Sequence, residues 1–557
     1  MALNFADLFE HAADAFGART AVACGDRRVT YAQLDERTNR LAHHLAGLGV
    51  GPGYHVGLYA RNSIEALETL IASCKLRACA VNINYRYVEN ELRYMFADAD
   101  LTALVYDRRL APLVAATVHA APGLRARVEI DDGSPATRQT ATPQTATPET
   151  AGTDYNTALN AASPQRDFPP RSNDDVYIIY TGGTTGYPKG VMWRHEDIWR
   201  TLGGGIDFIT GEPLPDEWAQ SRKGLENGEF VKLCAAPLIH GNAQVAALAG
   251  LFAGETIVLL PAFDPDEIWR AVARHQVNVL VIIGDAMARP LVEAYAQGGY
   301  DASSLVAVSS SAALFSPAVK DACAKALPDT VITEAIGSTE TGFAGISFVS
   351  AGEPHRGGPT VMAGPDVIVL GDDGRPAGPG QIGRLARGGH VPLGYYKDPA
   401  RTAAMFAEVD GKRYAIPGDM ARVEDDGTVT LLGRGNTCVN TGGEKVFPEE
   451  VEGALKSHPD VFDALVIGVP DALLGQRVAA LIQPRPGAKP DLGALQEHVR
   501  RQLAGYKVPR TIWLAGAIRR TVSGKADYAW AREYAATHAP GLDRVSGAHS
   551  SSTKRQA

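Results

Sequence analysis

A stretch of glycines, threonines and one lysine has the composition of a loop that binds anions. Glycine allows backbone N–H groups to turn toward one point and to approach a ligand closely, and successive N–H groups in such a turn form a concave site for an anion. Threonine hydroxyls add donors, and the lysine adds a mobile positive charge. The stretch therefore has the chemistry expected of a polyphosphate site. Its members are Thr181, Gly182, Gly183, Thr184, Thr185, Gly186 and Lys189.

The spacing of this loop is not that of the common mononucleotide P-loop. That pattern requires G-x-x-x-x-G-K-[ST], whereas Lys189 stands three residues after Gly186 and directly after Pro188. The order T-G-G-T-T-G-Y-P-K-G resembles instead the AMP-forming adenylating superfamily, which includes acyl-CoA synthetases, peptide-synthetase adenylation domains and luciferases. The alternative is a surface loop with an incidental lysine, but every specified position agrees with the pattern.

A second motif, residues 337–340, supplies a candidate metal ligand. Gly337, Ser338, Thr339 and Glu340 resemble the Gly-x-Thr-Glu element of the same superfamily, which implies nucleotide contacts there. Mg²⁺ takes oxygen ligands and needs only one or two protein groups beside phosphates and water. The resemblance assigns Glu340 as the carboxylate, with Thr181 as a second ligand; a glutamate in a surface loop is the alternative. Ile336 replaces an aromatic that stacks on adenine in many relatives, so an aliphatic contact is expected.

Further positions correspond to ribose and hinge residues of the relatives. Asp419 ends an Ile-Pro-Gly-Asp sequence, and a carboxylate can accept hydrogen bonds from ribose hydroxyls; a plain turn aspartate is the alternative. Arg434 has the spacing of a second ribose contact, and Asn436 stands at the hinge position. The small-residue end of the strand expected over residues 305–314 matches a Gly-Gly-Ala-Pro segment of relatives, which implies a nucleotide contact from Ser311.

The C-terminal part carries two more motifs. Residues 440–452 resemble the second-domain signature Gly-Gly-Glu-x-Val-x-Pro-x-Glu-[IV]-Glu. In relatives the glycines matching Gly442 and Gly443 line the channel for the pantetheine arm of CoA. Lys525 stands where relatives carry a lysine that neutralises charge between the attacking carboxylate and the α-phosphate. A solvated surface lysine is the alternative, and the agreement of the other motifs favours the catalytic role.

One histidine could lie between the two substrates. His240 stands where relatives have an aromatic residue or a histidine between the acyl pocket and the pantetheine tunnel. A core histidine bonded to backbone is the alternative. The alanine-rich helix expected over residues 242–252 either packs closely on its neighbours or leaves room for a bulky ligand.

Alternating strands and helices must bring these distant motifs together. Such alternation implies a parallel sheet, in which ligands gather at the carboxyl ends of the strands. Three expected strands end in small residues and fit this geometry: residues 277–284, 305–314 and 331–342. Helices are expected over residues 3–16, 31–47, 63–78 and 492–503, further strands over 56–59 and 465–468, and irregular surface over 202–230.

We expect an α/β protein with a large and a small domain. The large domain, residues 1–433, is predicted to contain mixed and parallel sheets flanked by helices, with an antiparallel β subdomain over residues 360–433. Residues 131–166 include a Thr/Ala/Pro repeat without an apolar face and are expected to be a flexible excursion. Residues 434–540 are predicted to form a small, mobile α+β domain, and residues 541–557 a disordered tail.

Composition limits the class of protein. The chain has 557 residues and a net charge of −9, so no basic stripe suggests nucleic acid as a partner. The N-terminus lacks a basic region before an apolar run, and no run of about 18 apolar residues exists, so neither a signal peptide nor a transmembrane segment is expected. The six cysteines show no CxxC spacing, which favours reduced thiols in a cytoplasmic protein. Homo-oligomerisation is left open.

The resemblance extends over nearly the whole chain and implies a two-step ligase. A carboxylic acid would react with ATP in the presence of Mg²⁺ to give an acyl-adenylate, which CoA would convert to a thioester. Residues 190–198, 284–290 and 394–398 are most similar to actinobacterial ligases of fatty acids and steroid side chains. They imply a steroid side-chain acid or another bulky hydrophobic acid, with a medium- or long-chain fatty acid as the alternative.

A different class, an inactive nucleotide- or acyl-binding homologue, is also considered. Such a homologue is expected to have lost one or more of the charged motif residues. All five are present: Lys189, Glu340, Asp419, Arg434 and Lys525.

Overall fold

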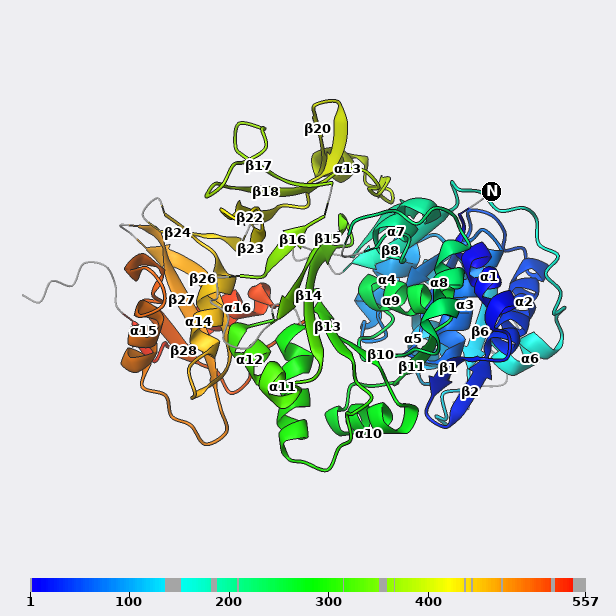
Figure 1. Cartoon of the computed structure of the whole chain (residues 1–557), viewed down its shortest axis with the longest axis horizontal. Coiled ribbons are helices and arrows are strands. Elements are labelled where there is room, and N and C mark those ends of the chain that lie inside the picture. The colour runs from blue at the N-terminus through cyan, green and yellow to red at the C-terminus, as the bar shows by residue number, and fades with distance from the viewer. Residues whose placement is uncertain are drawn as a thin grey trace, which may run out of the picture.

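A large α/β body and a small C-terminal domain lie side by side in the computed structural model (Figure 1). This arrangement confirms the predicted fold class. The structure describes residues 3–135, 152–181, 188–207, 210–313, 315–349, 358–364, 366–434, 437–441, 444–471, 474–521 and 526–543.

The N-terminal helices begin where the sequence provides side-chain caps. Asn4 accepts a hydrogen bond from the backbone N–H of Ala6, and Thr30 forms a capping box with Gln33. Such caps satisfy backbone donors that lack an intrahelical partner. These helices are α1 (Phe5–Phe16), α2 (Tyr31–Gly47) and α3 (Ile64–Lys75).

A five-stranded parallel sheet follows, in the order β4-β3-β5-β6-β7. Every residue of β3, β4 and β5 is buried, as expected for strands of a parallel sheet covered on both faces. The strands are β3 (His55–Tyr59), β4 (Cys79–Asn82), β5 (Leu101–Asp107), β6 (Ala126–Ile130) and β7 (Thr153–Asp154), and the accompanying helices are α4 (Glu89–Asp98), α5 (Ala111–Thr117) and α6 (Tyr155–Asn160).

The largest sheet contains the three strands that were predicted to end in small residues. Its strands β1, β11, β10, β12, β13 and β14 run parallel in that order, and helices connect β11 through β14 in sequence. The predicted neighbourhood of the three small-residue strand ends is therefore confirmed. The elements are β1 (Thr20–Cys24), β2 (Arg27–Thr30), β10 (Val231–Cys234), α9 (Gly241–Phe252), β11 (Thr256–Leu259), α10 (Pro265–His275), β12 (Val279–Ile282), α11 (Gly284–Ala296), β13 (Ala307–Ser311), α12 (Pro317–Ala326) and β14 (Val331–Ser338).

Beyond β14 this sheet becomes antiparallel and continues into the β subdomain. The hairpin of β14 and β15 leads through β16 to β23 and β22, which matches the predicted antiparallel character of residues 360–433. The elements are β15 (Gly342–Val349), β16 (Thr360–Ala363), β17 (Val367–Leu370), β18 (Ile382–Arg387), α13 (Pro399–Met405), β20 (Phe406–Val409), β21 (Lys412–Ala415), β22 (Asp419–Val423) and β23 (Val429–Arg434).

A separate three-stranded antiparallel sheet holds the two ends of the glycine-rich loop. Strand β8 (Val176–Thr181) precedes the loop and β9 (Lys189–Arg194) follows it, with Thr181 opposite Lys189. The third strand, β19 (Gly394–Tyr395), pairs with β9. Helix α7 (His195–Thr201) directly follows β9 in the chain.

The small domain has apolar clusters of its own, built from residues that follow Cys438. Its sheet has the order β25-β24-β27-β28-β29, with β26 also paired to β27. The elements are β24 (Val439–Thr441), β25 (Glu444–Val446), α14 (Pro448–Lys456), β26 (Val461–Asp471), β27 (Gly475–Pro484), α15 (Leu492–Arg500), β28 (Thr511–Leu514), α16 (Tyr528–Thr537) and β29 (Leu542–Asp543).

Three stretches expected to be irregular contain regular structure in their described parts. Helix α8 (Ala219–Asn227) lies within residues 202–230, so the prediction of irregular surface was wrong there. Within residues 131–166, β7 and α6 are formed, and the buried Tyr155 donates to Glu68 Oε2 at 2.7 Å. Strand β29 lies at the start of the stretch predicted as a tail. Residues 136–151 and 544–557 lie outside the described chain.

No helix in the described part of the chain is long and apolar enough to cross a membrane.

Candidate functional site

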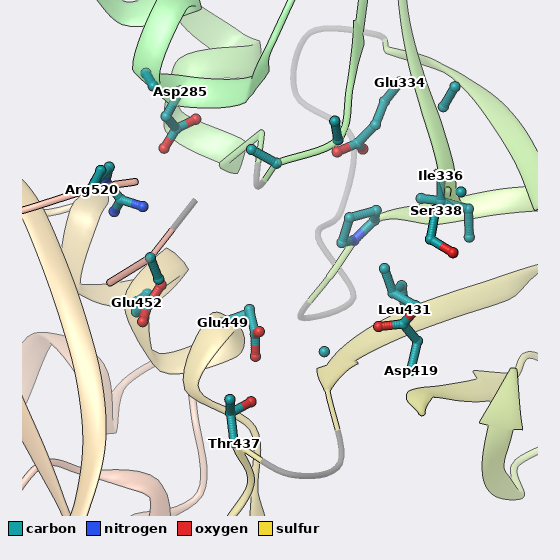
Figure 2. Close-up of a pocket in the computed structure, with 18 of the residues that line it drawn as sticks. Asp285, Glu334, Ile336, Ser338, Asp419, Leu431, Thr437, Glu449, Glu452 and Arg520 are labelled. Carbon is teal, nitrogen blue, oxygen red and sulfur yellow. The ribbon is translucent and has the colours of Figure 1, made fainter. Parts of the chain in front are cut away.

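A cavity lies where the carboxyl ends of β12, β13 and β14 meet the β22–β23 hairpin and the small domain (Figure 2). In the figure, Glu334, Ile336, Ser338, Leu431 and Asp419 occupy one side, and Thr437, Glu449, Glu452 and Arg520 of the small domain occupy the other. The cavity therefore joins side chains from widely separated parts of the sequence.

One wall of the cavity is apolar. Ile336 is buried and lines the cavity with Ala312 and Leu431, which could contact a flat ring without hydrogen bonds. Ala312 follows Ser311 and has φ of +67°, a left-handed conformation that glycine adopts more easily. This strained position marks the turn where relatives were expected to carry glycine.

Glu334 is a functional candidate that the motifs did not indicate. It lies two residues before Ile336 on β14 and lines the same cavity. One carboxylate oxygen is paired with Lys320 of α12, while Oε1 has no hydrogen-bond partner among the described residues. Burial raises the pKa of Glu334, and Lys320 partly offsets this effect. A buried unsatisfied carboxylate oxygen is costly, so this oxygen is a candidate acceptor for a ligand donor.

The hairpin of β22 and β23 presents the predicted ribose residues. Asp419 begins β22, lines the cavity and stands opposite Arg434 at the end of β23. The side chain of Arg434 lies outside what the structure describes. Gly433 has φ of +106°, and a Cβ there would lie 2.1 Å from Glu449 Oε2. A glycine at this place thus lets α14 of the small domain approach the hairpin.

Gly337 is required by packing within the β14–β15 hairpin. A Cβ at Gly337 would lie 2.2 Å from the carbonyl oxygen of Gly342, at an irregularity in the pairing of the two strands. This close approach fixes the path of the chain that continues through Ser338 to Glu340.

Glu340 is nearly buried and is held by a tyrosine. Tyr395 Oη donates to Glu340 Oε1 at 3.1 Å, and the described residues give Oε2 no hydrogen bond. The preceding residue is also fixed, because Trp193 Nε1 donates to the carbonyl oxygen of Thr339 at 2.9 Å. The described part of the chain contains no group of three or more metal-binding side chains. One carboxylate oxygen nevertheless fits a dication that takes its other ligands from phosphates and water.

Lys189 lies close to the same segment as Glu340. Its Nζ donates to Tyr94 Oη at 3.2 Å and lies 3.9 Å from Asp398 Oδ2. Since Tyr395 bonds Glu340 and Asp398 approaches Lys189, residues 395–398 contact both of these predicted site residues. Thr181 stands across from Lys189, at the opening of the glycine-rich loop.

His240 is linked to the end of β8 but does not line the described cavity. It precedes α9 as its N-cap. The side chain of Asn82 donates to the carbonyl oxygens of Ile239, at 2.6 Å, and Tyr180, at 2.9 Å. This contact holds the segment that contains His240 next to the strand leading to the loop.

The predicted residues thus fall into groups. Gly337, Ser338 and Asp419 meet in the cavity, and Ser311 directly precedes its wall. Lys189 and Glu340 share contacts with residues 395–398. The remaining predicted positions lie outside the described residues, namely Gly182, Gly183, Thr184, Thr185, Gly186, Asn436, Gly442, Gly443 and Lys525.

The small domain contributes charged groups to the cavity. Ala526, the residue after Lys525 in the sequence, lines the cavity together with Arg520 and Lys456. Arg520 Nη2 lies 2.6 Å from Asp463 Oδ1, and both basic side chains hold the pKa of Asp463 below its usual range against the effect of burial. Arg520 is the first residue of the motif that ends at Lys525, but the sequence gave no reason to assign it a role. No motif indicated Lys456, which is one of several charged residues of α14.

Comparison with known proteins identifies relatives of both parts. The family model described as AMP-binding enzyme matches residues 9–396, and the model described as AMP-binding enzyme C-terminal domain matches residues 450–525.

The curated relatives are similar over nearly their whole length. The 3-oxocholest-4-en-26-oate–CoA ligase of Rhodococcus rhodochrous is 52% identical over 96% of this chain and 96% of its own. The medium/long-chain-fatty-acid–CoA/3-oxocholest-4-en-26-oate–CoA ligase of Mycobacterium tuberculosis is 50% identical over 99% of each chain. Among solved structures, ATP-bound MatB from Rhodopseudomonas palustris has a TM-score of 0.78 and 26% identity, covering 95% of this chain and 99% of its own.

Proposed function

The chain belongs to the family of AMP-binding enzymes, and from this premise we propose that it is an ATP-dependent carboxylate–CoA ligase. The observation that carries the proposal is the cavity in which Ile336 and Ser338 of one motif and Asp419 of another face the small domain. We propose that this cavity receives the adenosine part of ATP. The predicted domain limits, residues 1–433 and 434–540, and the hinge at Asn436 are part of the proposal.

Each side of the cavity has a role in holding the nucleoside. Ile336 and Ala312 would contact the base, and Asp419 would accept hydrogen bonds from the ribose hydroxyls, with Arg434 as the second ribose contact. The unpaired Oε1 of Glu334 would accept a hydrogen bond from the exocyclic amino group of adenine. The phosphates would then extend toward the glycine-rich loop and Lys189.

In the first step, an oxygen of the substrate carboxylate attacks the α-phosphorus of ATP. A carbon–oxygen–phosphorus linkage forms, and the bond to the β-phosphate oxygen breaks, releasing pyrophosphate and leaving an acyl-adenylate. Lys189 and Lys525 offset the negative charge that accumulates between the reactants. When bound at Glu340, with Thr181 as a second ligand, Mg²⁺ would neutralise phosphate charge.

In the second step, the thiolate sulfur of CoA attacks the carbonyl carbon of the adenylate. The carbon–oxygen bond to the phosphate breaks, and AMP leaves with the bonding electrons. Gly442 and Gly443 would line the path of the pantetheine arm, with His240 between this path and the acyl group. Exclusion of water by the small domain would protect the mixed anhydride from hydrolysis.

For the substrate we propose a steroid side-chain acid or another bulky hydrophobic acid. Support comes from the name of the Rhodococcus relative, a 3-oxocholest-4-en-26-oate–CoA ligase, at 52% identity. The name of the mycobacterial relative includes medium- and long-chain fatty acids, so a fatty-acyl-CoA ligase is the second candidate.

A substrate panel tests these proposals. The purified protein receives ATP, Mg²⁺, CoA and one acid at a time: 3-oxocholest-4-en-26-oate, octanoate, palmitate or an aryl acid. We expect equal amounts of AMP and acyl-CoA, with the highest kcat/KM for the steroid acid. Higher kcat/KM for palmitate contradicts the steroid proposal, and absence of acyl-CoA with every acid contradicts the ligase.

A cytoplasmic location is proposed from the cysteines. All six are free thiols, as expected for a protein kept in a reducing compartment. Burial raises the pKa of Cys79 and Cys234 to about 12, which keeps both in the unreactive thiol form.

A further inference from the structure

Helix α11 presents a line of charged side chains to the small domain. Asp285, Arg289 and Glu293 are spaced four residues apart, which places them on one face of the helix. Each contacts a residue of the small domain. These contacts are Asp285 with Lys456, Arg289 with Phe462, and Glu293 with Arg485. We call these three side chains of α11 the α11 docking face.

A hydrogen bond within the large domain orients the Asp285 carboxylate toward Lys456. The backbone N–H of Ser316 donates to Asp285 Oδ1 at 2.7 Å, which leaves Oδ2 directed to the interface. Lys456 Nζ donates to this Oδ2 at 3.1 Å, and the lysine side chain is only 1% exposed. A buried ammonium requires a charge partner, and the nearest other carboxylate, that of Asp463, lies 3.9 Å away and also binds Arg520. Asp285 therefore provides the closest charge partner of Lys456.

The other two contacts extend the docking face toward solvent. The Arg289 guanidinium lies 5.7 Å from the centroid of the Phe462 ring, within the range of a cation–π contact. Glu293 and Arg485 are 3.1 Å apart and are 46% and 39% exposed. Exposed pairs contribute little energy but can fix orientation. The docking face thus has a buried ionic end and an exposed end.

The buried end of the docking face borders the nucleotide cavity. Asp285 and Lys456 both line that cavity, as do Arg520 and Ala526 of the small domain. In the docked arrangement, the part of the small domain that contains Arg520 and Ala526 therefore faces the cavity. The proposed first step needs this side of the domain, because Lys525 immediately precedes Ala526 in the sequence.

We propose that the α11 docking face, and above all the Asp285–Lys456 contact, holds the small domain in the arrangement that activates the acid, and that the contact is released for transfer to CoA. The inference rests on the proposed function. Asp285 and Lys456 are positioning residues: they act on the first half-reaction through the placement of the small domain and do not touch the reacting atoms.

The test separates the two half-reactions. Asp285→Asn keeps an oxygen for the Ser316 N–H but removes the charge that faces Lys456. We expect acid-dependent ATP–pyrophosphate exchange to fall about tenfold, since truncating a buried charge pair is costly. Consumption of a supplied acyl-adenylate with CoA should be unchanged. Equal loss in both half-reactions, or no loss in either, would overturn the proposal.

The exposed end of the docking face allows a charge-reversal test without disturbing a buried group. Arg485→Glu should slow pyrophosphate exchange, and the double variant Glu293→Arg with Arg485→Glu should restore it. The matched control is Glu497→Gln, which removes an exposed ion pair with Arg500 inside the small domain and should leave both half-reactions unchanged. Failure of the double variant to exceed Arg485→Glu would overturn the proposal.

These assays distinguish the inference from the proposed function. If the ligase proposal itself were wrong, the unmodified protein would form no acyl-CoA. If only the docking inference were wrong, the unmodified protein and Glu497→Gln would still form acyl-CoA. Asp285→Asn would then match the unmodified protein in both half-reactions.

Discussion

Glu334 is a proposed nucleotide contact that the structure indicates and the sequence motifs did not. Its Oε1 lacks a partner among the described residues and lies in the wall of the cavity beside Ile336. Glu334→Gln replaces a charged acceptor by a neutral amide. Because hydrogen bonds to charged groups contribute about 1.5–3 kcal/mol, KM for ATP should rise at least about tenfold with little change in kcat.

Steady-state kinetics at saturating acid and CoA measure this effect. Glu267→Gln is the control, since Glu267 lies on α10 and pairs with Arg270 at 2.9 Å. An unchanged KM for ATP in Glu334→Gln would contradict the assigned contact.

Lys525 carries the clearest residue-level prediction from the sequence. Lys525→Ala removes the positive charge proposed to lie between the carboxylate and the α-phosphate. Pyrophosphate exchange should fall by a factor of about 10² to 10³, the usual range for loss of one electrostatic contact at a transition state. Thioester formation from a supplied acyl-adenylate should persist. The exposed lysine of the same domain, Lys489, provides the control Lys489→Ala, and equal loss in both half-reactions would contradict the role.

Residues within motifs were predictable, and isolated charges were not. Ser338 and Asp419 stand in recognisable patterns because backbone turns and hydrogen-bonding side chains must occur together at a phosphate or ribose site. Both line the cavity. Glu334, Asp285 and Lys456 carry no such pattern, since a charged residue in a strand or helix does not by itself reveal which residue it faces. Their positions emerged only when strand ends and the small domain were brought together.

At the scale of elements, a neutral histidine links α1 to α7. The backbone N–H of Phe5 donates to His195 Nδ1 at 3.0 Å. Burial of the ring lowers the pKa of His195 from 6.5 to about 4. Between these two pKa values, His195 therefore binds a proton in the unfolded chain but not in the folded protein. This contribution to stability is complete above pH 6.5 and is lost as the pH falls toward 4.

The consequence is a pH-dependent free energy of unfolding. Between pH 7 and pH 5, His195 should account for a loss of about 2 kcal/mol. Urea denaturation of the protein and of His195→Gln at both values measures this difference, because glutamine offers an acceptor without titrating. The variant should lose about 2 kcal/mol less than the unmodified protein over the interval. Identical losses would contradict the assignment.

Element boundaries followed local signals where those signals were strong. The cap at Thr30 and the apolar spacing behind it predicted a helix over residues 31–47, and α2 covers that range. Helix α8 was missed because its sequence is polar and lies among glycines and prolines. The pairing of β8 with β9 across the loop could not be predicted, since turn residues do not show whether the flanking strands are antiparallel neighbours.

At the scale of the whole molecule, we propose that two domains share one nucleotide. Strand ends of the large sheet lie at one edge, and Lys456 and Arg520 of the small domain line the cavity there. Figure 2 shows Arg520 on the side of the small domain. The sequence predicted this division, because its motifs fall in both parts. The relative placement of the parts could not be predicted, since contacts such as Asp285–Lys456 join residues with no shared motif.

Transfer of a carboxylate oxygen from the acid to AMP would be direct evidence that an acyl-adenylate forms and is cleaved. The acid is labelled with ¹⁸O in its carboxylate and incubated with the protein, ATP, Mg²⁺ and CoA, and the products are analysed by mass spectrometry. Formation and cleavage of an acyl-adenylate predict one ¹⁸O atom in each AMP and none in pyrophosphate. Unlabelled AMP, or label in another phosphate product, would contradict the account.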